Sequence, residues 1–466
     1  MLSAHMRGLA YVLIISCLAC FDGGAATHFV VMPGTAGVNP EDPYTNWATA
    51  GTNIIDVVNA AMTNAATRLI WVTNGTYYPT NTINVSQSVT LQSVNGRDVT
   101  ILNGRDNITN RGLYFTAASS TLDGFTITNH VISSFGAGVR ADSAINVINC
   151  LITGNRSTNS YGGGCYLNGA SAISNCIIRG NIAYSYGGGI HHVGSGLRMD
   201  GCLIEDNSID LVSTHADRYG GGFYMTSSEH VTVTNCQFVN NRANRGAAIA
   251  TYVGTANDIM VANCTIRSNQ TASHGAIYVL NPVNIVNCTI SDNVATNADS
   301  VGGGFSGGTL RNCLVVRNRC NNKGGGYYGA GNIGSSTIAS NCAGYGGGGG
   351  ICFAGGMGTN NIIYHNTASV APNYTNNAGV VGLDYSCVFP AVAGTGNITN
   401  DPGMIDLNGG NYQLALGSLC INTGTNEGWM TNVVDLDGHR RVDRLSGRVD
   451  MGAYEFIHKI TLISGY

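Results

Sequence analysis

The sequence predicts an all-β protein, a right-handed parallel β-helix of about twelve coils, on three observations. A heptad with the pattern Asn-Cys-x-Ile-x-x-Asn recurs at steps of 24–28 residues, apart from one step of 34. A glycine triplet followed by an apolar residue recurs in phase with that heptad. The composition favours a repeat structure over a mixed domain, because Gly makes up 65 of 466 residues while charged residues make up only 10%.

The heptad has the two-residue periodicity of a β-strand. In the copy that begins at Asn149, Cys150 and Ile152 lie on one face and Leu151 lies on the other. The Ile position is apolar in every copy, so this face is predicted to point inward and to stack its cysteines about 4.8 Å apart. Neighbouring cysteines could pair geometrically, but we expect a mostly reduced ladder of small, buried side chains. The heptad cysteines are Cys150, Cys176, Cys202, Cys236, Cys264, Cys288 and Cys313.

The last residue of each heptad is Asn, as at Asn155 and Asn181. Asn tolerates the left-handed conformation of a sharp turn, and its amide can bond to the next copy. We therefore expect an asparagine ladder along one corner of the helix. The long step of the repeat indicates an inserted loop around Ile209 to Arg218.

The chain divides into five segments on this interpretation. Residues 1–26 read as a signal peptide, with Arg7 before the apolar run Leu9 to Phe21. In an alternative interpretation, the segment before Cys17 is a lipobox and Cys17 is the lipidated N-terminus. The other segments are an N-terminal cap at 27–83 with a helix across 53–62, coils at 84–384, a C-terminal cap at 385–456 and a tail at 457–466. No further stretch is apolar and long enough to cross a membrane.

Two motif sets resemble known families. Phe238-Val239-Asn240-Asn241 and His274-Gly275-Ala276-Ile277 resemble the repeats of bacterial polymorphic outer-membrane proteins, although most copies here have Ile in place of Phe. The closing segment Asp435 to Arg441, with Val449 to Glu455, resembles the signature of choice-of-anchor Q proteins. That resemblance implies an exported bacterial β-helix of the pectin-lyase-like fold and leaves the mode of surface attachment open. The lead-in and the segments before the signature carry the same resemblance at Trp47 to Ala50, Asn74 to Tyr77, Asp401 to Gly403 and Tyr412 to Ser418.

Catalytic motifs are sparse in the sequence. A glycoside hydrolase of this fold needs carboxylates about 5–10 Å apart, and the chain has no Asp-Asp pair. Glu205 follows Arg179 by one coil in the same column, which predicts a cross-coil ion pair. The net charge of -4 gives no electrostatic basis for binding nucleic acid.

Two motifs contain the residue types of a metal site. Asp435-x-Asp437-Gly438 resembles the opening of a calcium loop, but the Glu that closes such a loop is absent, so we favour a turn closed by Asp caps and Arg440 or Arg441. His191 and His192 are adjacent in the sequence. Adjacent residues of a regular strand face opposite ways, so these two side chains cannot bind one metal ion. No catalytic residue, metal site or cofactor is therefore predicted.

One column of outward-facing residues indicates a candidate ligand-binding surface. Each glycine triplet is followed by an apolar residue that is predicted to face inward, and the next residue is predicted to face outward. These outward residues form a column along the helix, and we expect their rings to be displayed on one face. Aromatic side chains with polar tips on a β-face suit a sugar ring, although such rings can also stack only for stability. The column reads Tyr166, His191, Tyr224, Ala250, Tyr278, Ser306 and Tyr328, and its five rings are the candidate glycan-binding residues.

The function predicted from these features is a non-catalytic, exported β-helix of the bacterial cell surface or extracellular space that adheres to or binds glycan. The alternative is a carbohydrate-active enzyme of the same fold, most plausibly a polysaccharide lyase. The alternative requires an Arg and two carboxylates that converge in a groove.

Overall fold

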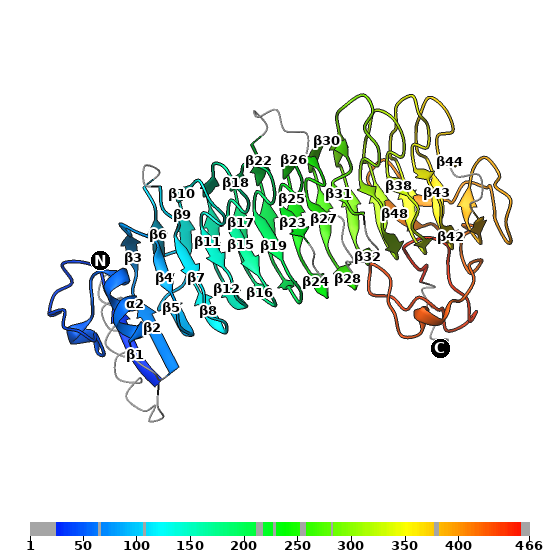
Figure 1. Ribbon diagram of the computed structural model, residues 1–466. Helices are drawn as coiled ribbons and strands as arrows, with labels where there is room; N and C mark the ends of the chain where they lie inside the picture. Colours follow the sequence, from blue (N-terminus) through cyan, green and yellow to red (C-terminus); the bar gives the residue numbers. More distant parts are fainter. Residues whose placement is uncertain are drawn as a thin grey trace, which may run out of the picture.

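The computed structural model describes residues 25–63, 67–105, 109–210, 218–226, 230–251, 258–280, 283–376 and 382–457. Within this part of the chain, the protein is an elongated stack of coils, and the C-terminal segment folds back against the last of them (Figure 1). Strands of successive coils pair in parallel, which confirms the expected right-handed β-helix of about twelve turns.

The coil strands form four parallel sheets, called A to D. Sheet A contains, in spatial order, β1 (Ala25–Val30), β2 (Thr67–Val72), β5 (Val89–Ser93), β8 (Ser120–Asp123), β12 (Ile145–Ile148), β16 (Ala172–Ser174), β20 (Arg198–Asp200), β24 (Val231–Thr234), β28 (Ile259–Ala262), β32 (Val283–Val286), β36 (Thr309–Arg311), β39 (Ile333–Gly334), β42 (Met357–Thr359) and β45 (Gly382–Asp384). Sheet B contains β3 (Gly75–Tyr77), β6 (Thr100–Asn103), β9 (Thr126–Thr128), β13 (Leu151–Thr153), β17 (Ile177–Arg179), β21 (Leu203–Glu205), β25 (Gln237–Val239), β29 (Thr265–Arg267), β33 (Thr289–Ser291), β37 (Leu314–Val316), β40 (Thr337–Ala339), β43 (Ile362–Tyr364) and β46 (Cys387–Val388).

Sheets C and D complete each coil. Sheet C contains β4 (Ile83–Val85), β7 (Leu113–Phe115), β11 (Val139–Ala141), β15 (Cys165–Asn168), β19 (Ile190–Val193), β23 (Phe223–Thr226), β27 (Ile249–Thr251), β31 (Ile277–Tyr278), β35 (Phe305–Ser306), β38 (Tyr327–Gly329), β41 (Ile351–Phe353) and β44 (Tyr374–Asn376). Sheet D is shorter and contains β10 (Val131–Ile132), β14 (Arg156–Ser157), β18 (Ile182–Ala183), β22 (Ser208–Ile209), β26 (Arg242–Arg245), β30 (Gln270–His274) and β34 (Val294–Ala295).

The register between coils follows the heptad. Ile152 of β13 pairs with Ile178 of β17, which pairs with Ile204 of β21, and all three side chains are fully buried. The heptad cysteines are also buried, and each thiol donates to the carbonyl oxygen two residues earlier at 3.0–3.3 Å. Burial raises the pKa of Cys176 well above its usual value, and every heptad cysteine is enclosed in the core.

The predicted asparagine ladder is confirmed. From Asn155 to Asn366, each rung donates both its backbone N–H and its Nδ2–H to the side-chain oxygen of the next rung, at 2.9–3.1 Å. The rungs are Asn155, Asn181, Asn207, Asn241, Asn269, Asn293, Asn318, Asn341, Asn366 and Asn373.

The conformation expected for these Asn residues is wrong. The positive φ angles belong instead to the first Asn of each heptad, such as Asn149 at 53°, and to the residue before each rung, such as Gly154 at 65°. Left-handed residues on either side of the short sheet B strand turn the chain at both corners. The rung itself keeps an ordinary backbone, so its amide points into the stack.

His130 ends the ladder. Its backbone N–H donates to Asn155 Oδ1 at 3.1 Å, so it occupies the rung position one coil before Asn155. The ring is fully buried, and burial lowers the pKa of His130 to about 4. The first rung of the column is therefore a neutral imidazole.

The N-terminal end is closed by β1 at the edge of sheet A and by α2 (Ile54–Met62). The expected helix is confirmed, with Ile54, Val57, Val58 and Ala61 buried and the Asn53 side chain accepting the Ile55 N–H. A short 3-10 turn, η1 (Trp47–Thr49), precedes it. Residues 1–24, which include Arg7, Cys17 and most of the expected signal, lie outside the described residues, as do 211–217 of the expected insertion and the tail from 458.

The C-terminal segment packs on the side of the last coils. It contains the antiparallel pair β47 (Met404–Asp406) and β48 (Asn411–Leu414) and the turn η2 (Gly428–Met430). Tyr412 packs against outward-facing residues of sheet B, among them Leu314 and Val316. The coil before has Thr289 and Ser291 at those positions, so the outer face becomes apolar where the cap covers it. Among the described residues, no helix has the length and apolarity required to span a bilayer.

Removal of one rung tests the ladder. Asn207→Ala leaves the Asn181 N–H, the Asn181 amide and the Ile178 carbonyl without their partner, so we expect the free energy of unfolding to fall by roughly 2–4 kcal/mol. Thermal and denaturant unfolding measure the change. Asn146→Ala, on the exposed face of sheet A, is the control and should stay within about 0.5 kcal/mol of the wild type.

Acid unfolding tests the His130 rung. A buried neutral His has a folded pKa below its unfolded value of about 6.5, so its contribution is complete above that pH and is lost as the pH falls toward 4. His130→Asn removes this loss and supplies an amide of the ladder type. Between pH 7 and pH 4.5 the variant should lose roughly 2–3 kcal/mol less unfolding free energy than the wild type. Equal losses would show that His130 is not held neutral.

Candidate ligand-binding groove

The predicted ring column is in register along sheet C. Tyr166 of β15 pairs with His191 of β19, which pairs with Tyr224 of β23, and the column continues through Ala250 to Tyr278. Ser306 and Tyr328 follow in the same column. The spacing of the repeat thus placed these residues correctly.

The expectation that the rings are openly displayed is wrong. His191 is 4% exposed, Tyr224 3% and Tyr278 8%, while Tyr166 and Tyr328 are partly exposed. A second row of rings covers the column. This outer row consists of the residue immediately before each glycine triplet or its variant and contains Phe135, Tyr161, Tyr186 and Tyr219.

The glycines allow the two rows to meet. Gly162 has a φ of 66°, which turns the chain after Tyr161. A Cβ on Gly163 would lie 2.5 Å from the carbonyl oxygen of Gly188 in the next coil, so only glycine permits this approach. The row residue is therefore held beside the strand that carries the column residue.

The two rows pack as one aromatic ladder. Tyr186 lies 4.8 Å from Tyr161 and 4.8 Å from Tyr224 between ring centroids, the latter pair being stacked at 17°. His191 contacts Tyr161 and Tyr166 edge-on, at 5.3 Å in each case. Offset and edge-on pairs of this kind stabilise by about 0.5–1.5 kcal/mol each beyond burial.

A groove of about 420 Å³ runs along this ladder. Its floor is buried His191 and Tyr224, while its walls are partly exposed. None of the lining residues is a carboxylate, Arg or Lys, so the groove offers ring faces and a few polar atoms. The lining residues are Phe135, Tyr161, Tyr166, Tyr186, His191, Val193, Tyr224 and Thr226.

His191 is neutral in this groove. Burial, and then the neighbouring His192, lower the pKa of His191 to about 3. Its Nε2 lies 3.0 Å from the Thr226 hydroxyl. As expected for adjacent strand residues, His192 faces away and places its Nε2 2.9 Å from the Gly169 carbonyl oxygen, so the two rings share no ligand.

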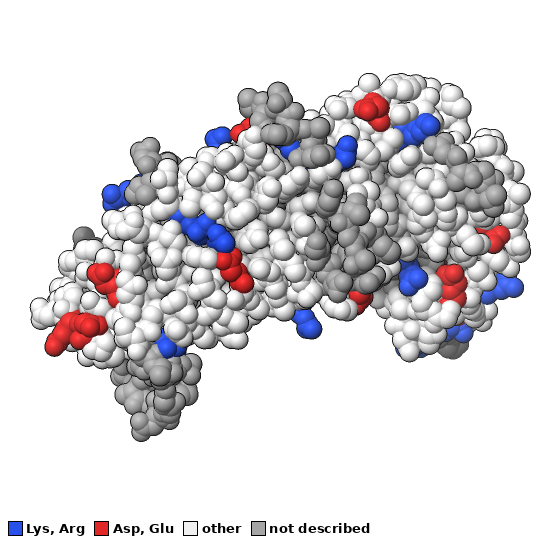
Figure 2. Space-filling model, in the orientation of Figure 1, with Lys and Arg blue, Asp and Glu red and all other residues white. Residues whose placement is uncertain are grey.

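A charged cluster adjoins the groove one coil earlier. The Arg140 guanidinium lies 5.6 Å from the Phe135 ring and 5.8 Å from the Tyr166 ring and forms a two-bond ion pair with Asp142, at 2.8 and 2.9 Å. Burial alone would raise the pKa of Asp142, but hydrogen bonds from Arg140 and Tyr114 lower it. Charged residues are sparse over the middle coils, and neighbouring blue and red groups lie at the position of β11 (Figure 2).

The other end of the ladder is basic as well. Arg245 donates to the Tyr219 hydroxyl at 2.9 Å and lies 5.7 Å from the Tyr278 ring. Tyr278 stacks on Tyr219 at 5.8 Å and thereby joins the ladder outside the groove lining. Tyr328 is two coils beyond Tyr278, separated by Ser306, so the structure does not bring it to the groove.

The outer row was missed in the sequence, although a signal was present. A ring precedes the glycines at Gly136, Gly162, Gly187 and Gly220. These residues lie at bends or isolated bridges outside the named strands, so strand periodicity does not reveal them. Their constant position relative to the glycines would have done so.

The remaining sequence candidates have structural roles. Arg179 and Glu205 form the expected cross-coil ion pair at 3.3 Å, with the Arg179 side chain 48% exposed. A hollow of about 490 Å³ on sheet A is lined in part by Arg198, His230 and Asp258. The His230 and Asp258 side chains there are 67% and 74% exposed, so both contact solvent more than they contact the protein.

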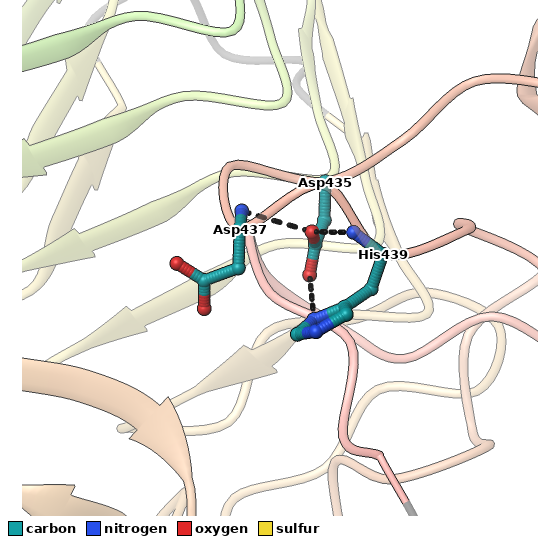
Figure 3. Close-up of side chains that lie close together, drawn as sticks. All are labelled: Asp435, Asp437 and His439. Atoms are coloured by element: carbon teal, nitrogen blue, oxygen red, sulfur yellow. Dashed lines mark hydrogen bonds and ion pairs between the residues drawn. The ribbon is translucent and has the colours of Figure 1, made fainter.

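Asp435, Asp437 and His439 are close enough to hold a metal ion, with ligand atoms within 4.8 Å of one another. However, the buried Asp435 carboxylate already accepts the backbone N–H groups of Asp437 and His439, at 2.9 and 2.7 Å (Figure 3). It also accepts the Glu455 N–H at 2.7 Å. The favoured interpretation of a turn therefore fits these contacts. Arg441, rather than Arg440, closes the turn by pairing with Glu455 at 3.2 Å.

The match to one family model agrees with this fold. Residues 81–281 match the family model described as "Right handed beta helix region". No curated protein matches the chain. Similar solved structures include pectate lyase Pel9A (16% identity, 93% of this chain and 97% of that chain, TM-score 0.42) and the Dettilon tailspike protein gp208 (15%, 75% and 68%, TM-score 0.43).

A third similar structure is PfbA, a surface adhesin of Streptococcus pneumoniae (12% identity, 71% of this chain and 89% of that chain, TM-score 0.28). The names of these proteins span a lyase, a tailspike and an adhesin.

Calcium provides a test of the turn. Asp435→Asn replaces one acceptor oxygen with an N–H donor facing a backbone N–H, so we expect roughly 2 kcal/mol of destabilisation. In the wild type, neither the addition of Ca²⁺ nor the addition of EGTA should shift the temperature of the thermal transition. Asp437→Asn, at an exposed carboxylate, is the control. A Ca²⁺-dependent rise in the wild-type transition that Asp437→Asn removes would identify a metal site instead.

Proposed function

We propose that this chain is an exported, non-catalytic β-helix protein that binds glycan along the aromatic groove of sheet C. The observation that carries the proposal is that the column and the outer row together line an aromatic groove with a volume of about 420 Å³. Concave, mostly apolar sites with a few placed polar groups are the usual form of ligand pockets.

The chemistry of the lining suits a sugar. Ring faces contact the C–H face of a pyranose, while hydroxyl and imidazole groups exchange hydrogen bonds with its hydroxyls. Tyr161, Tyr166 and Tyr186 are partly exposed and supply such faces. Because the rings repeat at each coil, the groove offers the same surface several times along the helix axis. An extended, repeating ligand matches that arrangement better than a compact one.

Export and surface location belong to the same proposal. They are supported by the signal-like residues 1–26, or by Cys17 if the lipobox interpretation holds, and by the resemblance of the closing signature to choice-of-anchor Q proteins. Adhesion to a cell-surface or extracellular polysaccharide would follow from a groove that binds glycan without cleaving it.

A polysaccharide lyase is the second candidate, and Arg140 beside Asp142 is the observation that favours it. A lyase needs a cation near the uronate and a free base for its α-proton. Asp142 instead accepts hydrogen bonds from Arg140 and Tyr114, which lower its pKa and weaken it as a base. Incubation with polyuronates, followed at the absorbance of unsaturated products, should give none. Product formation that Asp142→Asn abolishes would favour the lyase.

Ring removal tests glycan binding. Tyr161→Ala and Tyr186→Ala each remove one wall of the groove, and a ring contact of about 1 kcal/mol predicts a several-fold weaker Kd for each, with a larger loss for both. A glycan array selects the ligand, and calorimetry with that oligosaccharide measures Kd. Tyr328→Ala, in the same column but outside the groove, should bind like the wild type. No ligand on the array, or equal losses in all three variants, would contradict the proposal.

A further inference from the structure

Cys387 does not belong to the cysteine ladder. In the last coils the inward position is taken by Ser336, Asn361 and Ser386, which are linked in turn by backbone-to-side-chain hydrogen bonds of 3.1 Å. Cys387 is the next residue, the first of β46, and pairs with Ile362 of β43. Since successive strand residues face opposite ways, the Cys387 side chain lies on the outer face of sheet B.

Cys420 of the C-terminal segment meets it there. Both side chains are fully buried in one apolar cluster that also contains Ile362, Leu414 and Met451. The Cys387 thiol donates to the Asn400 carbonyl oxygen at 3.2 Å, and its contact with the Cys420 thiol is the largest cause that raises the pKa of Cys387. Two cysteines from different structural units are thus in contact at the interface between coil and cap.

The backbone holds both cysteines in place. The Cys387 N–H donates to the Asn361 carbonyl oxygen at 2.7 Å, which fixes it to the coil before. The Cys420 carbonyl oxygen accepts the Met451 N–H at 3.0 Å, and the Cys420 N–H donates to the Ser418 hydroxyl at 3.1 Å. The approach of the thiols is therefore part of how the cap docks.

The environment differs from that of the ladder. A ladder cysteine such as Cys264 has a cysteine in the coil on each side, and its thiol is satisfied by the carbonyl two residues before it. The pair of Cys387 and Cys420 is isolated from that column. It joins the last coil to a segment that also docks through apolar contacts and through hydrogen bonds such as those of Asn360 with Thr425 and Gly452.

We infer that Cys387 and Cys420 form a disulfide that clamps the C-terminal cap to the last coil when the chain folds in an oxidising compartment. The two thiols lose two protons and two electrons as the Sγ–Sγ bond forms. A disulfide-form oxidant, such as a thiol oxidoreductase or glutathione disulfide, accepts them and becomes two thiols. The ladder cysteines stay reduced, because each thiol lies inside the coil and donates to the carbonyl oxygen two residues before it.

Differential alkylation of the full chain tests this inference. The chain is secreted to the periplasm of a bacterial host and, separately, produced in the cytoplasm. The folded fraction of each, selected by size exclusion and resistance to trypsin, is denatured in iodoacetamide and mapped by peptide mass. We expect a linked peptide pair containing Cys387 and Cys420 only in the periplasmic protein, and alkylated Cys150 to Cys313 in both.

Two variants keep the test specific. Cys420→Ala should abolish the linked pair, leave Cys387 alkylated and remove the drop in thermal transition that a reductant causes in the periplasmic wild type. Cys264→Ala, in the ladder, should retain the linked pair and the reductant effect. Alkylated Cys387 and Cys420 in folded periplasmic protein, or linkage of Cys387 to another cysteine, would overturn the inference. Glycan binding is measured separately, so either claim can fail alone.

Discussion

The structure depends on the register between successive coils, and the buried asparagine ladder is what fixes it. Each rung binds both N–H groups of the rung before it, so a coil displaced by one residue would leave two buried donors without a partner. The inward Cys and Ile columns add apolar burial that the same shift would expose. Register is thus set by a polar column and an apolar one at once.

The aromatic groove follows from that register. Rings at one repeat position come to lie one coil apart, and those before the glycines come to lie beside them. Neither set of rings forms the groove alone. The outer row covers the column on sheet C, and the column forms the floor beneath the outer row. The neutral His191 and the absence of charge from the lining leave ring stacking and hydrogen bonding as the available interactions.

Much of the fold and of the groove was predictable from the sequence, because in a solenoid the place of a residue in the repeat determines its place in the structure. The inward faces, the ladder, the ring column and the helix at 53–62 follow from strand or helix spacing. The outer row lies outside the strands, so strand spacing did not reveal it and only its fixed position before the glycines marks it, and the burial of Tyr224 depends on how that row packs. The packing of Tyr412 on Leu314 joins segments about a hundred residues apart, which no local pattern specifies.

The most direct test is a crystal structure of the chain with the oligosaccharide that it binds most tightly. We expect sugar rings stacked on Tyr161 and Tyr186 between Phe135 and Thr226, with the chain of sugars running along the helix axis. Sugar density on sheet A or B with the aromatic groove empty would contradict it.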